Sequence, residues 1–152
     1  MKKIIFILAI ISFLILFSGC TGNDQYMDLP AEDGNFYYSN KDLGFNLVLP
    51  PEFNYYQTQR KLTNNYIDLE FFVPTSDKDY LQEVQGYAKP IVVRVFEKDK
   101  WEEMKDSGIY QFIGGNKSNV YSIRFWEETP VDWSEKWSEE MKKNIIDNFE
   151  IK

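Results

Sequence analysis

The stretch Ile91-Val92-Val93-Arg94-Val95-Phe96 decides the fold of this chain. Apart from Arg94 it is an unbroken apolar run, and most of its residues are β-branched. Short apolar runs of this composition are typical of strands that are buried on both faces. We therefore expect this stretch to be the central strand of a sheet.

Segments before this strand alternate apolar with polar residues, most clearly Phe45–Leu49 and Tyr66–Val73. In the second segment one face carries Ile67, Leu69, Phe71 and Val73, and the other carries Tyr66, Asp68, Glu70 and Phe72. This alternation predicts an antiparallel sheet with one buried face. Shorter strands are expected at Asn35–Ser39 and at Tyr55–Leu62, and Thr63-Asn64-Asn65 is the expected hairpin tip after the latter.

Two helices are expected after the central strand. Asp99 and Glu102 have the spacing of a capping box and predict a short helix that ends near Gly108. Asp132 is the expected cap of an amphipathic C-terminal helix. The apolar residues expected to face the sheet are Trp101 and Met104 in the first helix, and Trp133, Trp137, Met141, Ile145 and Ile146 in the second.

A hairpin lies between these helices, with strands at Ile109–Ile113 and Asn119–Trp126. Phe149 and Ile151 are expected to close the fold as a short extended piece. Residues 36–152 are therefore predicted to form one α+β domain. Its core would be a single antiparallel sheet of about six strands, with the C-terminal helix and the short helix packed on it.

The chain begins MKKIIFILAIISFLILFSGC, residues 1–20. A positive start, an apolar centre of about 14 residues and small residues before Cys20 are features of a secretory signal peptide, because a membrane-spanning helix needs about 20 apolar residues. Residues 1–19 are therefore expected to be removed. The protein is then expected to act outside the cytoplasm.

The end of this segment, Leu16-Phe17-Ser18-Gly19-Cys20, resembles the lipobox of bacterial lipoproteins, with Phe17 where leucine is commonest. The resemblance implies that Cys20 receives the lipid and becomes the new N-terminus. The protein would then be held at the cell membrane or outer membrane by its lipid. Cys20 is the only cysteine in the chain, so no disulfide is expected.

The part of the chain after residue 19 is strongly acidic. All 24 acidic residues but only 15 of the 17 basic ones lie there, which gives its 133 residues a formal net charge of −9. Such a charge repels the phosphate backbone, so no nucleic-acid partner is expected. Residues 20–35 are polar, acidic and interrupted by Pro30, which predicts a flexible tether between the lipid and the domain.

The order of the predicted elements is similar to the α+β fold of the PsbP/Mog1 type, over roughly residues 36–151. The residues that carry the resemblance are Tyr37-Tyr38, Gly44-Phe45, Leu49-Pro50, Gly114-Gly115-Asn116 and the helix end Ile145–Phe149. That fold occurs in photosystem subunits, in a nuclear-transport factor and in bacterial lipoproteins of unknown role. No functional residue of those families maps onto this chain, so the resemblance implies a scaffold and no activity.

The chain has no histidine. This excludes Ser-His-Asp and Cys-His catalysis and the common histidine-containing zinc and copper sites. Gly115-Asn116-Lys117-Ser118 lacks the full spacing of a phosphate-binding loop and is better explained as a hairpin tip. No catalytic residue and no cofactor is therefore expected.

Two acidic clusters could offer oxygen atoms to Ca²⁺: Asp77 with Asp79, and Glu127-Glu128 with Asp132. A calcium site needs six or more oxygen ligands, usually on a loop with a glycine bend, and neither cluster provides them. Solvated loop charge is the preferred interpretation, and no metal site is expected.

Three functional hypotheses remain open. The first is a non-enzymatic lipoprotein that binds a protein partner at the cell envelope. The second is a module that binds a small ligand or glycan on aromatic rings, with Trp101, Trp126, Trp133 and Trp137 as candidate contacts if they line a groove and do not belong to the core. The third is a hydrolase that uses paired carboxylates, for which the sequence provides no geometry.

Overall fold

A computed structural model describes residues 29–104 and 109–152, without the side chain of Met104. The predicted signal peptide 1–19, the lipidation site Cys20 and the tether up to residue 28 lie outside the described residues, as does the predicted helix end near Gly108. Residues 31–35, which we expected to belong to the tether, form a turn in which the Gly34 amide donates to the Ala31 carbonyl at 2.9 Å.

The described residues contain eight strands, two α-helices and two 3-10 helices. In chain order these are β1 (Phe36–Asn40), β2 (Phe45–Leu49), η1 (Pro51–Phe53), β3 (Gln57–Leu62), β4 (Tyr66–Pro74), β5 (Tyr87–Glu97), α2 (Lys98–Met104), β6 (Gln111–Gly115), β7 (Asn119–Phe125), η2 (Val131–Trp133), α3 (Glu139–Asp147) and β8 (Glu150–Ile151). The strands form a five-stranded antiparallel sheet, ordered β3-β4-β5-β7-β6, and a three-stranded antiparallel sheet, ordered β1-β2-β8.

The predicted α+β fold with a single sheet is wrong, because the chain is mostly β and divides its strands between two sheets. Pro50 and Pro51 end β2, and Tyr55 then adopts a positive φ of 61°. The chain therefore leaves the small sheet before β3 begins. The small sheet is completed by β8, in which Ile151 pairs with Phe45, a contact too distant along the chain for local patterns to indicate.

The central position of the stretch 91–96 is confirmed. It lies within β5, which pairs with β4 on one side and with β7 on the other. Its alternate side chains are buried on opposite faces, with Val93 0% and Val92 2% exposed. A strand paired on both sides and covered on both faces explains why the run carries so few polar residues.

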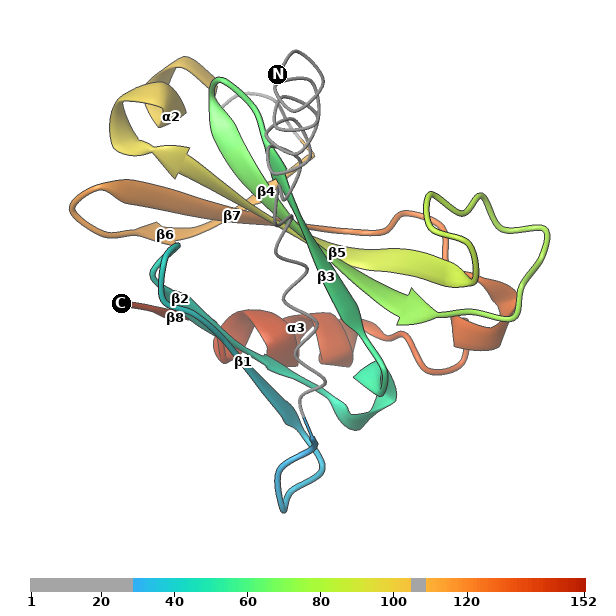
Figure 1. Cartoon of the computed structure of the whole chain (residues 1–152). Helices are drawn as coiled ribbons and strands as arrows, with labels where there is room; N and C mark the ends of the chain where they lie inside the picture. The colour runs from blue at the N-terminus through green and yellow to red at the C-terminus, as the bar shows by residue number, and fades with distance from the viewer. Residues whose placement is uncertain (1–28, 105–108) are drawn as a thin grey trace, which may run out of the picture.

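The main core lies between the two layers. In Figure 1 the small sheet and α3 lie together beneath one face of the five-stranded sheet, and α3 lies beside β2. Core side chains come from β2 (Phe45, Leu47, Leu49), from the large sheet (Leu69, Phe71, Ile91, Val93, Val95, Tyr121, Ile123) and from α3 (Met141, Ile145). These residues of the large sheet all have odd numbers, as the period of two requires, and only beyond the register shift between β4 and β5 does the even-numbered Ala88 join the same core.

The predicted C-terminal helix begins later than expected. Asp132 does not cap it but lies in η2, and α3 starts only after Ser138. The hydroxyl of Ser138 accepts a hydrogen bond from the Met141 amide at 3.1 Å, which satisfies one of the free amides at the helix start. Trp133 and Trp137 therefore lie before the helix, while Met141 and Ile145 are buried on it as predicted.

Both predicted hairpin tips are confirmed. Thr63 closes the first, where its amide donates to the Tyr66 carbonyl at 3.0 Å. In the second, Asn116 Oδ1 accepts from the amides of Ser118 at 3.0 Å and Asn119 at 2.8 Å. The glycine-rich segment is therefore a turn between β6 and β7, as the sequence indicated.

Candidate functional site

The second face of the five-stranded sheet carries buried charge. The sequence predicted a single buried face, but Asp68 and Glu70 on the opposite side of β4 are only 8% and 4% exposed, and Phe72 is 2% exposed. The prediction of one buried face, made from the alternation in Tyr66–Val73, is therefore wrong, whereas the expected burial of the central strand on both faces is confirmed. Buried carboxylates need cations and hydrogen bonds close by, because desolvation otherwise disfavours the charge.

Arg94 supplies this compensation for Asp68. Its Nε and Nη2 donate to the two carboxylate oxygens, each at 2.7 Å. The guanidinium carbon lies 3.5 Å from the centre of the Tyr66 ring and 4.1 Å from the centre of the Tyr110 ring. Burial acts to lower the pKa of Arg94, but the bonds to Asp68 outweigh it and the pKa is raised. The pair is a well-satisfied structural element.

Glu70 is compensated by two lysines. Its Oε1 accepts from Lys89 Nζ at 2.8 Å and from Lys61 Nζ at 3.1 Å, and its Oε2 lies 2.9 Å from the same Lys61 nitrogen. Oε2 has no hydrogen bond of suitable angle, but an ammonium at this distance still compensates its charge. Both lysines also pair with Glu83, Lys61 at 3.1 Å. Glu83 lies in the loop 75–86, so the quartet ties this loop to the sheet.

A groove of about 750 Å³ opens beside this quartet. Its floor comes from the second face of the sheet, and its walls come from the loop 75–86 and from residues 126–131. The lining residues are Phe72, Asp77, Asp79, Tyr80, Leu81, Glu83, Tyr87, Lys89, Val92, Arg124, Phe125, Trp126, Glu127, Glu128, Thr129 and Val131. A groove of this size lies within the range that holds small ligands or short chain segments.

Two carboxylates hold the walls of the groove together. Asp77 Oδ2 accepts a hydrogen bond from the Val131 amide at 2.9 Å. In the reverse direction, Asp132 Oδ1 accepts from Thr75 Oγ1 at 2.7 Å and its Oδ2 accepts from the Ser76 amide at 2.9 Å. Each loop therefore supplies a carboxylate to the other, and we call this arrangement the carboxylate lock.

The lock keeps both of its acids charged. The pKa of Asp77 is lowered, chiefly by the hydrogen bond from the Val131 amide. Burial acts to raise the pKa of Asp132, but the hydrogen bonds from Ser76 and Thr75 outweigh it and the pKa is lowered. Both carboxylates therefore serve as hydrogen-bond acceptors that join the two loops. Among residues 29–104 and 109–152 no group of three or more acidic or cysteine side chains could hold a metal ion.

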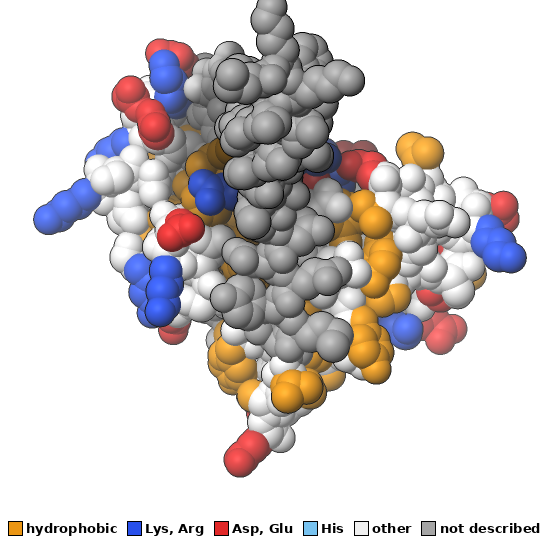
Figure 2. All heavy atoms as spheres, viewed as in Figure 1, with side chains coloured by type: hydrophobic (Ala, Val, Ile, Leu, Met, Phe, Trp, Pro, Cys, Tyr) orange, Lys and Arg blue, Asp and Glu red, His pale blue; other side chains and the backbone are white. Residues whose placement is uncertain are grey.

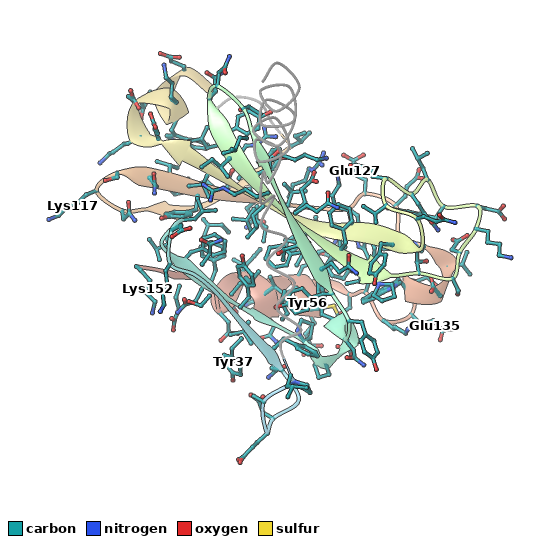
Figure 3. All side chains as sticks on the ribbon, in the orientation of Figure 1. Tyr37, Tyr56, Lys117, Glu127, Glu135 and Lys152 are labelled. Carbon is teal, nitrogen blue, oxygen red and sulfur yellow. The ribbon has the colours of Figure 1, made fainter. Side chains whose placement is uncertain are left out.

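Other carboxylates of the groove have no cation beside them in the described part of the chain. Asp79, Glu127 and Glu128 are exposed, and the pKa of Tyr80 is raised, first by burial and then by the negative charges of Glu128 and Glu83. Figure 3 shows Glu127 beside the lobe formed by the loop 75–86, while Lys117 and Lys152 lie at the opposite end of the molecule.

Apolar side chains complete the groove. Leu81 and Val131 line it, although they are 91% and 78% exposed, whereas Trp126 and Phe72 on the same groove are 9% and 2% exposed. Figure 2 shows that hydrophobic side chains also form a band on the face turned to the viewer, beside the lobe at the right of the view. An exposed leucine and valine next to buried rings form an apolar surface that no described residue covers.

The structure brings three of the four candidate tryptophans together. The ring centres of Trp126 and Trp137 are 5.1 Å apart, and those of Trp126 and Trp133 are 5.6 Å apart, both edge to face. Phe53 of η1 packs against Trp133. Trp126 lines the groove, while Trp133 is 2% exposed and Trp137 packs against the same core. These three tryptophans therefore belong mainly to the core, which was the alternative to their lining a ligand-binding groove.

Trp101 lies apart from the other three, on α2. Its ring contacts Phe96 at 5.2 Å and Phe112 at 5.6 Å between ring centres. It therefore covers the far end of the second face and does not reach the groove lining. Of the four candidate contacts only Trp126 lines the groove.

Sequence reasoning missed most of the groove. It noted Asp77, Asp79, Glu127 and Glu128 as two separate clusters and assigned no role to Leu81. The acidic composition of both loops was a visible signal. What was missing was their proximity, which requires knowing that both loops lie at the same end of the large sheet.

Comparison with protein families, with curated proteins and with solved structures found no match for this chain. The fold and the groove define a mostly β domain of two antiparallel sheets with an acidic and apolar groove at one end. In the described part of the chain no helix is long and apolar enough to cross a membrane.

Proposed function

We propose that this chain is a lipid-anchored extracytoplasmic protein that binds another polypeptide in the groove beside the loop 75–86. The observation that carries the proposal is the exposure of Leu81 and Val131, 91% and 78%, on the rim of a groove of about 750 Å³. Large exposed aliphatic side chains above a buried aromatic floor are typical of surfaces that become buried against a protein partner.

The polar part of the groove supports the same function. Protein interfaces combine a small apolar centre with a charged rim that stays hydrated until the partner binds. Here Leu81 and Val131 supply the apolar surface above the buried rings of Trp126 and Phe72, and Asp79, Glu127 and Glu128 supply the charged rim. The carboxylate lock holds the walls in place, so binding would require little rearrangement of the backbone.

The anchor rests on the first twenty residues. Secretion followed by lipidation is supported by Lys2 and Lys3, by the apolar run that follows them and by the lipobox-like end at Cys20. Two or more acyl chains would hold the protein stably at a membrane surface, since each buried methylene contributes about 0.8 kcal/mol. The groove would then be presented to neighbouring envelope proteins.

Site-specific photocrosslinking in intact cells tests the proposed function. A photoreactive phenylalanine analogue replaces Leu81 in one variant and Leu62 in the control. Leu62 is likewise exposed, at 71%, but lies on the hairpin away from the groove. We expect an adduct of one discrete mass from position 81, identified by mass spectrometry, and none from position 62. Equal or absent crosslinking at both positions would contradict the proposal.

A further inference from the structure

The charges of the groove indicate what kind of partner it fits. The inference deepens the proposed function and rests on it. Glu83 and Glu70 share Lys61 and Lys89, so this quartet is neutral as a whole. The remaining charges of the lining therefore decide the electrostatic potential that a partner meets.

The remaining charges are mostly negative. Asp79, Glu127 and Glu128 have no described cation within ion-pair distance, and Asp77 is bonded to backbone amides that leave its charge in place. Against these four acids stands Arg124, whose guanidinium lies 5.4 Å from the centre of the Tyr110 ring. A negatively charged partner would be repelled here, and a positively charged partner would be attracted.

The placement of the acids next to apolar groups restricts the partner further. Lysine and arginine carry a long apolar stem below the charged head, and the stem can pack on apolar surface while the head stays near water. Tyr80, Leu81 and Val131 offer such a surface, and Glu128 lies close enough to raise the pKa of Tyr80. The rings of Tyr80 and Trp126 could also receive a cation on their faces.

We propose that the groove binds an extended segment of a partner protein in which lysine or arginine side chains alternate with apolar ones. The apolar side chains would cover Leu81, Val131 and Trp126, and the basic ones would lie against Asp79, Glu127 and Glu128. Alternation suits an extended segment, because successive side chains point to opposite sides.

A labelled synthetic peptide of alternating lysine and leucine tests this proposal. Its binding to the complete chain in neutral detergent is followed by fluorescence anisotropy at low and high salt. The comparison peptides have glutamate in place of lysine, or serine in place of leucine. We expect the lysine–leucine peptide to bind most tightly and to weaken as salt is added, since exposed charges are screened beyond about 10 Å at 0.1 M salt.

Charge-reversal variants assign the binding to the groove. Glu127→Lys and Glu128→Lys should each weaken the lysine–leucine peptide by about tenfold, the equivalent of about 1.4 kcal/mol. Glu135→Lys is the matched control, because Glu135 is also exposed but does not line the groove. Figure 3 shows it on a different side of the loop lobe. Binding of peptide to the detergent is common to all variants, so the difference between variants reports the groove.

Three results would overturn the proposal: tighter binding of the glutamate peptide, equal binding of all peptides, or equal loss in the Glu135→Lys control. The proposed function can survive each of them. If position 81 still crosslinks to one envelope protein, the groove is a docking site for a partner of other chemistry. If neither experiment succeeds, both the proposed function and this inference fail.

Discussion

Tyr121 joins the two layers through a single hydroxyl group. Its side chain is fully buried on β7, and its Oη donates to the Leu43 carbonyl beside the small sheet at 2.7 Å. The Tyr121 hydroxyl oxygen in turn accepts a hydrogen bond from Asn116 Nδ2 at 3.1 Å. Gly44 has a φ of +72°, and a Cβ there would lie 3.1 Å from this hydroxyl, so glycine suits both the backbone and the contact.

Removing this hydroxyl should weaken the domain without changing its shape. Tyr121→Phe leaves a buried carbonyl without its donor, and we expect the free energy of unfolding to fall by about 1–3 kcal/mol. Urea denaturation followed by tryptophan fluorescence measures the change. Tyr37→Phe is the control, because its hydroxyl donates to Asp33 at 2.7 Å while the residue is 58% exposed. Equal effects in both variants would contradict a bridging role for Tyr121.

At the scale of elements, the carboxylate lock holds together the two loops that form the walls of the groove. Asp132 was predicted to cap a helix, and it instead binds Thr75 and Ser76 on the neighbouring loop. Short polar side chains can satisfy backbone amides in loops as well as at helix starts. The helix then begins six residues later, where Ser138 acts as the cap.

Breaking the lock should loosen one loop without unfolding the sheets. In Asp132→Ala the Ser76 amide loses its acceptor, and we expect its hydrogen exchange to accelerate by about tenfold, the equivalent of a charge-assisted bond of about 1.5 kcal/mol. Exchange in β5 should not change. Asp79→Ala is the control, since the Asp79 carboxylate accepts none of the hydrogen bonds that join the two loops. Faster exchange throughout β5 would mean that Asp132 supports the whole fold.

The quartet around Glu70 should make the attachment of the loop 75–86 depend on pH. The pKa of Glu83 lies below its ordinary value of 4.5, chiefly because Lys89 donates to it. Its contribution to stability is therefore present above pH 4.5 and is lost as pH falls through the lowered pKa. The pKa of Lys61 lies above 10.5, chiefly because of its bond to Glu70, so its contribution is lost only as pH rises beyond that value.

Thermal unfolding at several pH values checks this dependence. We expect the wild-type chain to unfold at a higher temperature than Glu83→Gln near neutral pH, and the difference to vanish well below pH 4.5, because both side chains are then uncharged. The difference should be small, since Glu83 is half-exposed and water screens the pair. Glu103→Gln, an exposed glutamate on α2, should show no such pH dependence. A constant difference across the range would contradict the assignment.

At the scale of the whole molecule, the proposed function needs both an anchor and a groove. The anchor is tested by Cys20→Ala, which removes the thiol that would receive lipid. We expect the variant to lose incorporation of labelled palmitate and to leave the membrane fraction, because a single uncleaved apolar segment shorter than a bilayer span anchors poorly. Thr21→Ala is the control and should retain both properties. Unchanged labelling in Cys20→Ala would rule out lipidation at this position.

Much of the local structure could be predicted because it depends on neighbouring residues. The alternation in Phe45–Leu49, the apolar run at 91–96 and the turn residues at Asn116 each specify backbone conformation within a few positions. The buried charge of Asp68 and Glu70 could not be predicted in this way. Alternation alone shows these residues on the face opposite the core, and the ion pairs with Arg94, Lys61 and Lys89 that compensate their burial come from other strands.

The sequence by itself determined where most strands lie and which stretch is central, and it predicts cleavage before Cys20 and lipidation of that residue. Only the tertiary structure decided that Phe45 pairs with Ile151 and that the strands form two separate sheets. It also decided that the loop 75–86 faces residues 126–131, which creates the groove. The physical reason is that strand propensity is local, whereas pairing and burial depend on residues that are distant in the chain and meet only in the folded protein.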